Sequence, residues 1–385
     1  MIDESRLDDP QSVAEIDRRD VLRTLALAGA NVRRTRVLAH ESGVDRVAGG
    51  DRPRAVLVAA VGASAVVGDV LDLLAEAGSP VSVATRRNVP LPGWVGPLDL
   101  VIAISQSGRA PGPLALAAEA GRRGASLLTV GAVDSPLADV AARYRGVHVD
   151  PEGGDATSRG SLWSLLVPAL LGAAAAGVVE PIDDLLDEVA DALDTKAEEC
   201  RPSSESFVNP AKILAVGLGE TVPVVLGDGA LTGVVAARAA AMVSRTARIP
   251  TTCGELPDAA SQVVAAFDGP YGTGAVDGRV DDIFADPFLD APARPRLGLL
   301  MLREPLPDPV TEADAARHNL AQAVADSAQE AGVKVWEQVA PGGPPLVRLA
   351  DQIALVDYTA TYLAIGLGLD PAGSAHVADL RDRTR

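Results

Sequence analysis

The sequence predicts an α/β protein with two doubly wound parallel sheets in tandem and helical extensions at both ends. Three observations lead to this fold class. Short apolar runs rich in Val, Ile and Leu alternate with helical segments, which is typical of doubly wound sheets. A strand–turn–helix pattern in the first half of the chain recurs in the second half. The length of 385 residues suits two domains of ordinary size.

Composition excludes several classes of function. Hydrophobic residues make up 48% of the chain and aromatic residues only 3%, so Ala, Val and Leu must build the core. The net charge of −18 argues against nucleic acid and against an anionic membrane surface, because both are bound through Lys and Arg. Cys200 and Cys253 offer neither a disulfide framework nor metal-ligand spacing. With no signal pattern or membrane-length apolar run, we expect a cytoplasmic protein without metal or cofactor.

The elements of the first half follow from their patterning. Residues 1–50 are predicted to be polar and helical, with amphipathic pieces at 13–28 and 33–41 whose arginines form a solvated face. Five apolar runs follow as predicted strands, interleaved with helices: 55–61, 81–85, 99–104, 126–130 and 146–149. An apolar helix at 160–176 comes next, and an acidic helix at 180–200 is predicted to be a solvated link.

Two of the predicted strands end in turns suited to holding an anion. The first strand runs into 62–65 (Gly-Ala-Ser-Ala), and the strand at 99–104 runs into 105–108 (Ser-Gln-Ser-Gly). Each turn opens a helix, whose first N–H groups and dipole favour negative charge. Ser64, Ser105 and Ser107 add hydroxyl donors. A solvated turn that happens to contain serines explains the same pattern.

Arg159 is a further candidate for contact with an anion. It follows the glycine-rich stretch 151–158 and stands at the start of the apolar helix. An arginine there either forms a surface pair with a carboxylate or contacts an oxyanionic ligand, and the local pattern leaves both open.

The second half repeats the first with one change of charge. A strand at 222–226 leads into 227–230 (Gly-Asp-Gly-Ala) and a helix, in the register of 56–69. Asp228 places a negative charge in this turn and would repel phosphate, so we expect the phosphate site in the first copy alone. Further elements are predicted as strands at 297–302 and 334–338 and helices at 314–331 and 346–367. The predicted domains are a helical segment 1–50, a first domain 51–178, a linker 179–208, a second domain 209–345 with a long insertion 269–294, and a C-terminal helix and tail 346–385.

Together these motifs resemble a sugar isomerase (SIS) domain protein. The order of the 62–65 turn, the 105–108 turn, Arg159 and the tandem repeat is similar to the bifunctional phosphoglucose/phosphomannose isomerase family. In the second half, 209–212 (Asn-Pro-Ala-Lys) and 254–258 (Gly-Glu-Leu-Pro-Asp) resemble the same family. The likeness covers nearly the whole chain beyond residue 50 and implies two SIS domains that form a homodimer.

The resemblance assigns roles to several residues of this chain. It implies phosphate binding by Gly62, Ser64, Ser105 and Ser107, although Ala110 replaces a threonine donor of the family. Two further residues fall on catalytic positions of the family. Arg159 falls on the arginine that steadies the negative enediolate intermediate, and Ser374 on a threonine position linked to ring opening.

The two positions that move protons in this family are substituted here. The base, a glutamate two residues before an Ala-Lys/Arg-Ile stretch, falls on Arg245, and the ring-opening histidine falls on Ser261. Aldose–ketose isomerisation needs a group that takes a proton from carbon and returns it, and arginine stays protonated at neutral pH. Of the nearby ionisable residues Glu255, Asp258 and His376, Glu255 is the best candidate for a replacement base, although the simpler interpretation of Glu255 is a surface carboxylate.

These assignments predict a protein that binds a hexose 6-phosphate or a related phosphosugar. The first hypothesis is a relative of the glucose-6-phosphate and mannose-6-phosphate isomerases with a degenerate active site. The alternative is a sugar-phosphate sensor or scaffold that regulates a partner in carbohydrate metabolism without catalysis. A structural subunit that binds no phosphosugar is a third possibility.

Overall fold

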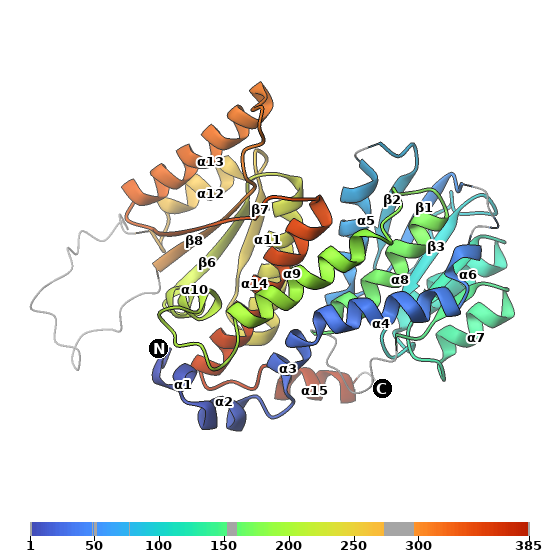
Figure 1. The fold of residues 1–385 in the computed structure, drawn as a ribbon, viewed down its shortest axis with the longest axis horizontal. Helices are drawn as coiled ribbons and strands as arrows, with labels where there is room; N and C mark the ends of the chain where they lie inside the picture. The colour runs from blue at the N-terminus through green and yellow to red at the C-terminus, as the bar shows by residue number, and fades with distance from the viewer. Residues whose placement is uncertain are drawn as a thin grey trace, which may run out of the picture. The chain divides into compact units, whose positions relative to one another are not determined.

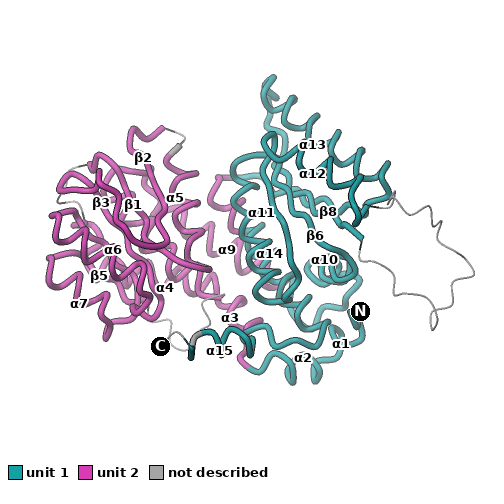
Figure 2. Tube along the Cα trace, turned by 180° about the vertical axis from the view of Figure 1, so that it is seen from behind, with its two compact units in different colours: residues 1–18, 199–343, 351–385 teal, residues 19–198, 344–350 magenta. Residues whose placement is uncertain are grey.

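A computed structural model of the chain describes residues 2–47, 49, 52–76, 78–151, 160–272 and 296–383. The chain divides into two compact units, coloured separately in Figure 2. Unit 1 comprises residues 1–18, 199–343 and 351–385, and unit 2 comprises residues 19–198 and 344–350. The helical residues 19–50 and 179–198, which the sequence suggests as flanking segments, are thus part of unit 2.

Unit 2 is built on a five-stranded parallel sheet, and all five predicted strands are present. Its strands are β1 (Ala55–Ala59), β2 (Ser82–Arg86), β3 (Leu100–Ile104), β4 (Ser126–Val130) and β5 (Val147–Val149). They lie in the order β2-β1-β3-β4-β5, with every neighbouring pair parallel. The three central strands are almost completely buried, which explains why their sequences are continuous apolar runs.

Helices cover the sheet of unit 2 (Figure 1). The unit contains α3 (Val21–Ala26), α4 (Ala28–Glu41), η1 (Val44–Arg46), α5 (Val66–Glu76), α6 (Pro111–Arg122), α7 (Pro136–Arg143), α8 (Leu162–Ala175) and α9 (Leu185–Glu199). Helix α6 packs on the sheet through Leu116, in one core with Leu57, Val101 and Leu127. Helix α8 is apolar on all sides because it contacts the sheet, α4 and α5 and is buried over most of its length.

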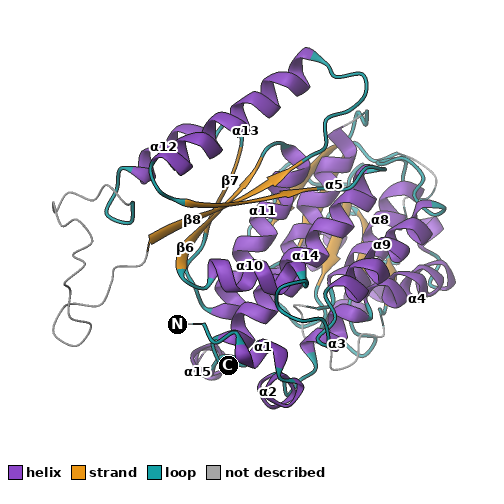
Figure 3. Cartoon of the chain, turned by 60° about the vertical axis from the view of Figure 1, so that its left-hand side comes forward, coloured by secondary structure: helices purple, strands orange, loops and turns teal. Residues whose placement is uncertain are grey.

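Unit 1 contains a four-stranded parallel sheet of related order. Strands β6 (Thr221–Gly227), β7 (Thr252–Glu255), β8 (Arg296–Arg303) and β9 (Lys334–Val339) lie in the order β7-β6-β8-β9. The helices are α1 (Ser5–Asp8), α2 (Pro10–Ile16), α10 (Pro210–Leu218), α11 (Ala230–Met242), α12 (Ala260–Phe267), α13 (Glu312–Glu330), α14 (Pro345–Gly366) and α15 (Ala375–Arg383). Residues 345–350 of α14 belong to unit 2. Figure 3 shows α12 and α13 on one face of the sheet and α10, α11 and α14 on the other. The order matches the first four strands of unit 2.

Several elements differ from the sequence-based expectation. The helix expected over 13–28 was wrong, because α2 ends at Ile16 and α3 begins at Val21, and Asp20 between them adopts a left-handed φ of 50°. Strand β7 and helices α12 and α15 were not predicted at all. The expected insertion 269–294 lies outside the described residues from 273 onward.

The charged faces of α4 and α9 are also not simply solvated. Arg33 pairs with Asp191 at 2.5 Å and with Asp194 at 2.7 Å. Arg36 pairs with Asp183 at 3.1 Å, and the His40 ring bonds the same carboxylate at 3.0 Å. The basic residues of α4 therefore face the acidic residues of α9 and of the turn before it, which the sequence of either helix alone does not reveal.

Candidate functional site

The topology of unit 2 brings the two serine turns together. Strand β1 pairs with both β2 and β3, so the sheet reverses its order of connection between β1 and β3. In open parallel sheets with this order, the crevice at the carboxyl ends of these two strands is where ligands bind. The short helix η2 (Gly62–Ala65) follows β1, and the 105–108 turn follows β3 and leads into α6. Ser64 and Ser105 therefore stand at neighbouring strand ends.

The three serines differ in exposure and in hydrogen bonding. Ser64 is 8% and Ser105 6% exposed, whereas Ser107 is exposed. The Ser105 hydroxyl oxygen accepts the Ala110 N–H at 3.2 Å, and that of Ser107 accepts the Arg109 N–H at 3.4 Å. Among the described residues, no acceptor is assigned to the hydroxyl proton of any of the three. Each serine can therefore donate to a ligand.

The 105–108 turn is held in a single shape by the neighbouring turn after β4. Gly108 has a φ of +63°, and a Cβ there would lie 2.0 Å from the Ser135 hydroxyl oxygen. Gly131 is equally close, since its Cβ would lie 2.1 Å from the Ser105 carbonyl oxygen. The Ala132 N–H donates to the Gln106 carbonyl at 3.0 Å. The hydroxyl and amide groups of the turn are thus fixed before any ligand arrives.

The start of α8 meets this turn through a side-chain hydrogen bond. The hydroxyl of Ser161, which is 2% exposed, donates to the Gln106 side-chain oxygen at 3.1 Å. Arg159, the residue expected to contact an oxyanion, lies outside the described residues. Ser161 and Ser135 were not predicted, because each acts through a partner more than twenty residues away in sequence.

At the corresponding strand ends of unit 1, the neighbouring donors bind a carboxylate of the protein itself. Asp228 follows β6, is 1% exposed, and accepts the Glu304 backbone N–H with both carboxylate oxygens, at 3.1 and 3.2 Å. Thr232 donates to it at 3.0 Å, and Arg317 pairs with it at 3.1 Å. These donors at the switch point are thus used by Asp228, while the expected exclusion of phosphate stays a prediction.

Arg245 and Ser374 lie in one region of unit 1. Arg245 is on η3 (Val243–Ala247), a π-helical turn that continues α11, and the following residue Arg248 adopts a left-handed φ of 62°. The Arg248 guanidinium donates to the carbonyls of Asp370, at 2.9 Å, and Gly373. The segment leading to Ser374 is therefore tied to the end of the π turn, and Ser374 precedes α15, where His376 is exposed.

Glu255 lies near the opposite end of α11, and Ser261 is on α12. Glu255 is the last residue of β7, not a loop residue, and its carboxylate lies against Gly233, where a Cβ would be 2.5 Å away. Gly233 is in the first turn of α11, twelve residues before Arg245, which is about 18 Å along a helix axis. Ser261 is exposed in the first turn of α12, three residues after the exposed Asp258. The structure thus does not bring Glu255 to the position of Arg245.

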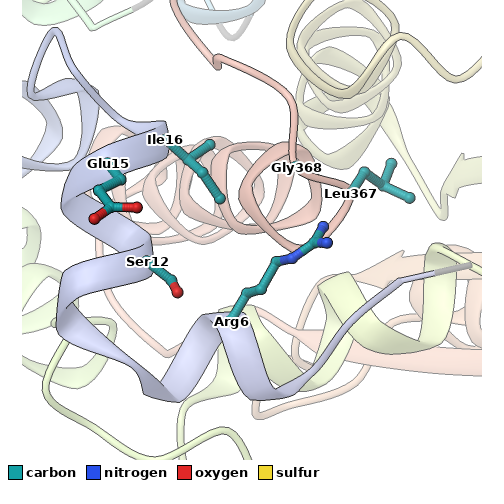
Figure 4. A pocket seen from close by; sticks show the side chains of 6 residues that line it. All are labelled: Arg6, Ser12, Glu15, Ile16, Leu367 and Gly368. Carbon is teal, nitrogen blue, oxygen red and sulfur yellow. The ribbon is translucent and has the colours of Figure 1, made fainter.

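A surface pocket of unit 1 contains none of the predicted site residues. It lies between α1, α2 and the end of α14, and is lined by Arg6, Ser12, Glu15, Ile16, Leu367 and Gly368 (Figure 4). Arg6 already pairs with Asp3 at 3.2 Å. The residues that line this pocket fit a phosphosugar no better than the residues of the two serine turns.

No group of three or more His, Cys, Asp or Glu side chains in the described ranges could hold a metal ion. No described helix is both long and apolar enough to span a membrane.

A family model matches the C-terminal part of the chain. Residues 207–384 match the family described as the bacterial phospho-glucose isomerase C-terminal SIS domain. The match and the two parallel-sheet units make the chain similar to SIS-domain proteins and to the phosphoglucose/phosphomannose isomerases.

Individual relatives support this placement. A bifunctional phosphoglucose/phosphomannose isomerase of Caldicellulosiruptor bescii is 26% identical over 195 residues, which are 51% of this chain and 57% of that protein. The match thus spans little more than half of the relative's length.

Solved structures share the fold over nearly the whole chain. A glucose-6-phosphate isomerase like protein from Thermus thermophilus aligns with a TM-score of 0.56 at 19% identity, over 96% of this chain and 99% of that one. A glucose-6-phosphate isomerase from Chlamydia trachomatis aligns with a TM-score of 0.64 at 12% identity, over 94% and 77%. At such low identity these structures establish the fold alone.

Proposed function

We propose that this protein binds a hexose 6-phosphate or a related phosphosugar through Ser64, Ser105 and Ser107. The observation that carries the proposal is the meeting of two serine turns at adjacent strand ends, with hydroxyl protons unassigned. Gly62 opens the first turn with a φ of +67°, which lets the backbone approach a phosphate closely. Helices α5 and α6 follow the two turns, so their N-terminal dipoles favour the same charge.

The chemistry that follows binding is the second part of the proposal. An isomerase of this family would use Arg159 to steady an enediolate and Ser374 to assist ring opening. A proton acceptor is needed in addition, and a positioned base is worth about 10²–10⁴-fold in rate. Arg245 cannot supply it, and Glu255 lies at the other end of α11. We therefore propose that isomerase activity is low or absent.

The lack of a base at the Arg245 position favours a second candidate function. A protein that binds a sugar phosphate but lacks a base at the Arg245 position is suited to sense the metabolite and regulate a partner. We also propose that the chain forms a homodimer in the cytoplasm, as the resemblance to SIS proteins implies. Sedimentation equilibrium of the purified protein tests the dimer, and a single monomeric species would contradict it.

Two measurements on one preparation separate the candidates. Coupled assays follow the interconversion of fructose 6-phosphate with glucose 6-phosphate and mannose 6-phosphate, while thermal unfolding reports binding of each sugar. Stabilisation without turnover supports the sensor, and turnover lost in an Arg159→Gln variant supports the isomerase. If none of these phosphosugars stabilises the protein, the binding proposal fails.

A further inference from the structure

The serine turns of unit 2 supply hydroxyl and amide donors but no cation. A phosphate monoester carries a charge of about −1.5 to −2 at neutral pH, whereas the whole chain already carries −18. Neutral donors bond the phosphate oxygens without neutralising this charge. The proposed site therefore needs a counter-charge within reach of the two turns.

Arg86 ends strand β2, beside the strand that leads into the first serine turn. Its register partner is Ala59 of β1, and the Ala60 N–H donates to the Arg86 carbonyl at 3.2 Å. Neighbouring strands of a sheet lie about 4.8 Å apart. Ser64 follows Ala60 by four residues. The backbone of Arg86 thus lies next to the point where the chain leaves β1 for η2.

The strand register places the Arg86 side chain on the face of the sheet that α6 covers. Ala59 is paired with Arg86 on one side and with Ala103 of β3 on the other. Both alanines belong to the core that contains Leu116 of α6. Paired residues of neighbouring strands point to the same face of a sheet. Arg86 therefore ends a row of small side chains on the face from which α6 follows the second serine turn.

The end of β2 also touches the first turns of both helices that follow the serine turns. A Cβ at Gly68, in the first turn of α5, would lie 2.0 Å from the Thr85 hydroxyl oxygen. A Cβ at Gly112, in the first turn of α6, would lie 2.5 Å from the Arg87 carbonyl oxygen. Arg86 lies between these two contacts in the sequence, so its backbone is close to both helix starts.

Arg86 differs from two other arginines near these turns in having no partner. It is exposed, and among the described residues none forms a hydrogen bond or an ion pair with its guanidinium. Arg87 interacts with Asp69 of α5: burial raises the pKa of this carboxyl group, and the charge of Arg87 acts in the opposite direction. The Arg109 guanidinium donates to the Asp134 carbonyl at 3.2 Å. The guanidinium of Arg86 is thus available to a ligand.

We propose that Arg86 supplies the counter-charge for the phosphate group bound at the serine turns. The inference rests on the proposed function and names the residue that recognises the charge of the ligand. A guanidinium donates two parallel charge-assisted hydrogen bonds to phosphate oxygens, which adds affinity and fixes the orientation of the group. The hydroxyls of Ser64, Ser105 and Ser107 then bind the remaining oxygens.

The test is calorimetric titration of fructose 6-phosphate into the full chain at about 0.05 M and about 0.5 M NaCl. The variants are Arg86→Gln and the charge-retaining Arg86→Lys. Arg87→Gln is the matched control, because it removes an adjacent exposed charge that already interacts with Asp69. Ser105→Ala reports on the serine turns themselves, and thermal unfolding without ligand shows that each variant is folded.

The proposal predicts that Arg86→Gln loses about tenfold in affinity at the lower salt concentration. Arg86→Lys loses less, because it keeps the charge, and Arg87→Gln changes affinity by about twofold or less. At the higher salt concentration the wild type and Arg86→Gln differ less, because salt screens an exposed charge. The unfolding temperature of Arg86→Gln without ligand stays that of the wild type, since this side chain is exposed and bonds no described residue.

Three results would overturn the proposal, and they separate it from the function on which it rests. Binding that depends on Ser105 but is equal in the wild type and Arg86→Gln refutes the role of Arg86 and leaves phosphosugar binding in place. Equal losses in Arg86→Gln and Arg87→Gln refute it as well, because the general charge of this surface would then attract the ligand. A wild-type protein that does not bind fructose 6-phosphate contradicts both proposals.

Discussion

Gly108 is the residue on which the shape of the proposed phosphate turn depends most. A left-handed backbone costs an L-residue about 1–2 kcal/mol, and a new Cβ would displace the Ser135 hydroxyl, which caps α7 by accepting the Ala138 N–H at 3.3 Å. Gly108→Ala is expected to lower the free energy of unfolding by about 2–3 kcal/mol and to weaken phosphosugar binding. Urea unfolding and calorimetric titration measure the two effects.

Gly93→Ala provides the matched control for Gly108. A Cβ at Gly93 meets no atom within 4 Å, and its φ is not in the left-handed range. This variant should change stability by less than about 0.5 kcal/mol. Equal stability of the two alanine variants would show that the turn is not strained by a side chain.

Lys212 holds the N-terminal segment of unit 1 by a buried ammonium group. The residue is completely buried, and its ammonium donates to the carbonyls of Leu7 at 2.6 Å, Ser204 at 2.7 Å and Pro202 at 3.0 Å. Lys212→Met keeps the packing but leaves these carbonyls without a donor, so we expect a loss of about 2–4 kcal/mol. The residues before α2 should also become sensitive to protease.

An exposed lysine serves as the comparison for Lys212. Lys334 is exposed and pairs with Glu220 at 3.2 Å, so Lys334→Met should cost no more than about 0.5 kcal/mol. If both methionine variants unfold alike, Lys212 is not the residue that ties down the N-terminal segment.

At the scale of elements, α4 is joined to the turn before α9 by hydrogen bonds that depend on the protonation of His40. The pKa of His40 is raised from its ordinary value of 6.5, first by its hydrogen bond with Asp183 and then by that with Asp45. Protonated His40 therefore stabilises the folded state. This contribution to the free energy of unfolding is complete below about pH 6.5 and is lost as the pH rises through the raised pKa of His40. The stability difference between the wild type and His40→Gln should therefore shrink between pH 6 and pH 9, as measured by urea unfolding. A difference that is constant or grows over this range would contradict the assignment.

The sequence predicted those elements whose patterning is local. The three central strands of unit 2 (β1, β3 and β4) are short runs that are apolar on both faces or nearly so, and the predicted strand 126–130 matches β4 residue for residue. Strand β7 escaped prediction because it is only four residues long and mostly exposed. The break between α2 and α3 escaped because it depends on the left-handed backbone of Asp20.

The candidate site was predictable only where its residues follow strands. Ser64 and Ser105 could be placed at one edge of the sheet, since the carboxyl ends of parallel strands share that edge. That β3 lies directly beside β1 is a finding of the structure. The pairing of Ser161 with Gln106 and the support of Gly108 by Ser135 arise from tertiary packing and have no local pattern. The placement of Glu255 on a strand, away from Arg245, needed the structure for the same reason.

At the scale of the whole molecule, the two units share one strand order but carry different charges at the point where that order reverses. In unit 2 the strand ends present serine hydroxyls, and in unit 1 they enclose the carboxylate of Asp228. In unit 1 this carboxylate is also paired with Arg317. The difference in charge supports the proposal that the phosphate site at a switch point belongs to unit 2.

Replacing Asp228 tests this account of the second copy. Asp228→Asn keeps the shape of the side chain but removes its charge, so the ion pair with Arg317 and the charge-assisted bonds from Glu304 are weakened. We expect a loss of about 1–3 kcal/mol in urea unfolding. Glu220→Gln, which changes the exposed partner of Lys334 at 3.2 Å, is the control and should be nearly neutral. Equal losses of unfolding free energy in the two variants would show that the buried carboxylate contributes no more to stability than an exposed one.

The most direct measurement is calorimetric titration of fructose 6-phosphate into the wild type and into a Ser64→Ala, Ser105→Ala, Ser107→Ala triple variant. Three charge-assisted hydrogen bonds are at stake, each worth about 1.5–3 kcal/mol. The account predicts saturable binding to the wild type and a loss of at least about 100-fold in affinity in a folded triple variant. Unchanged affinity in that variant would contradict it.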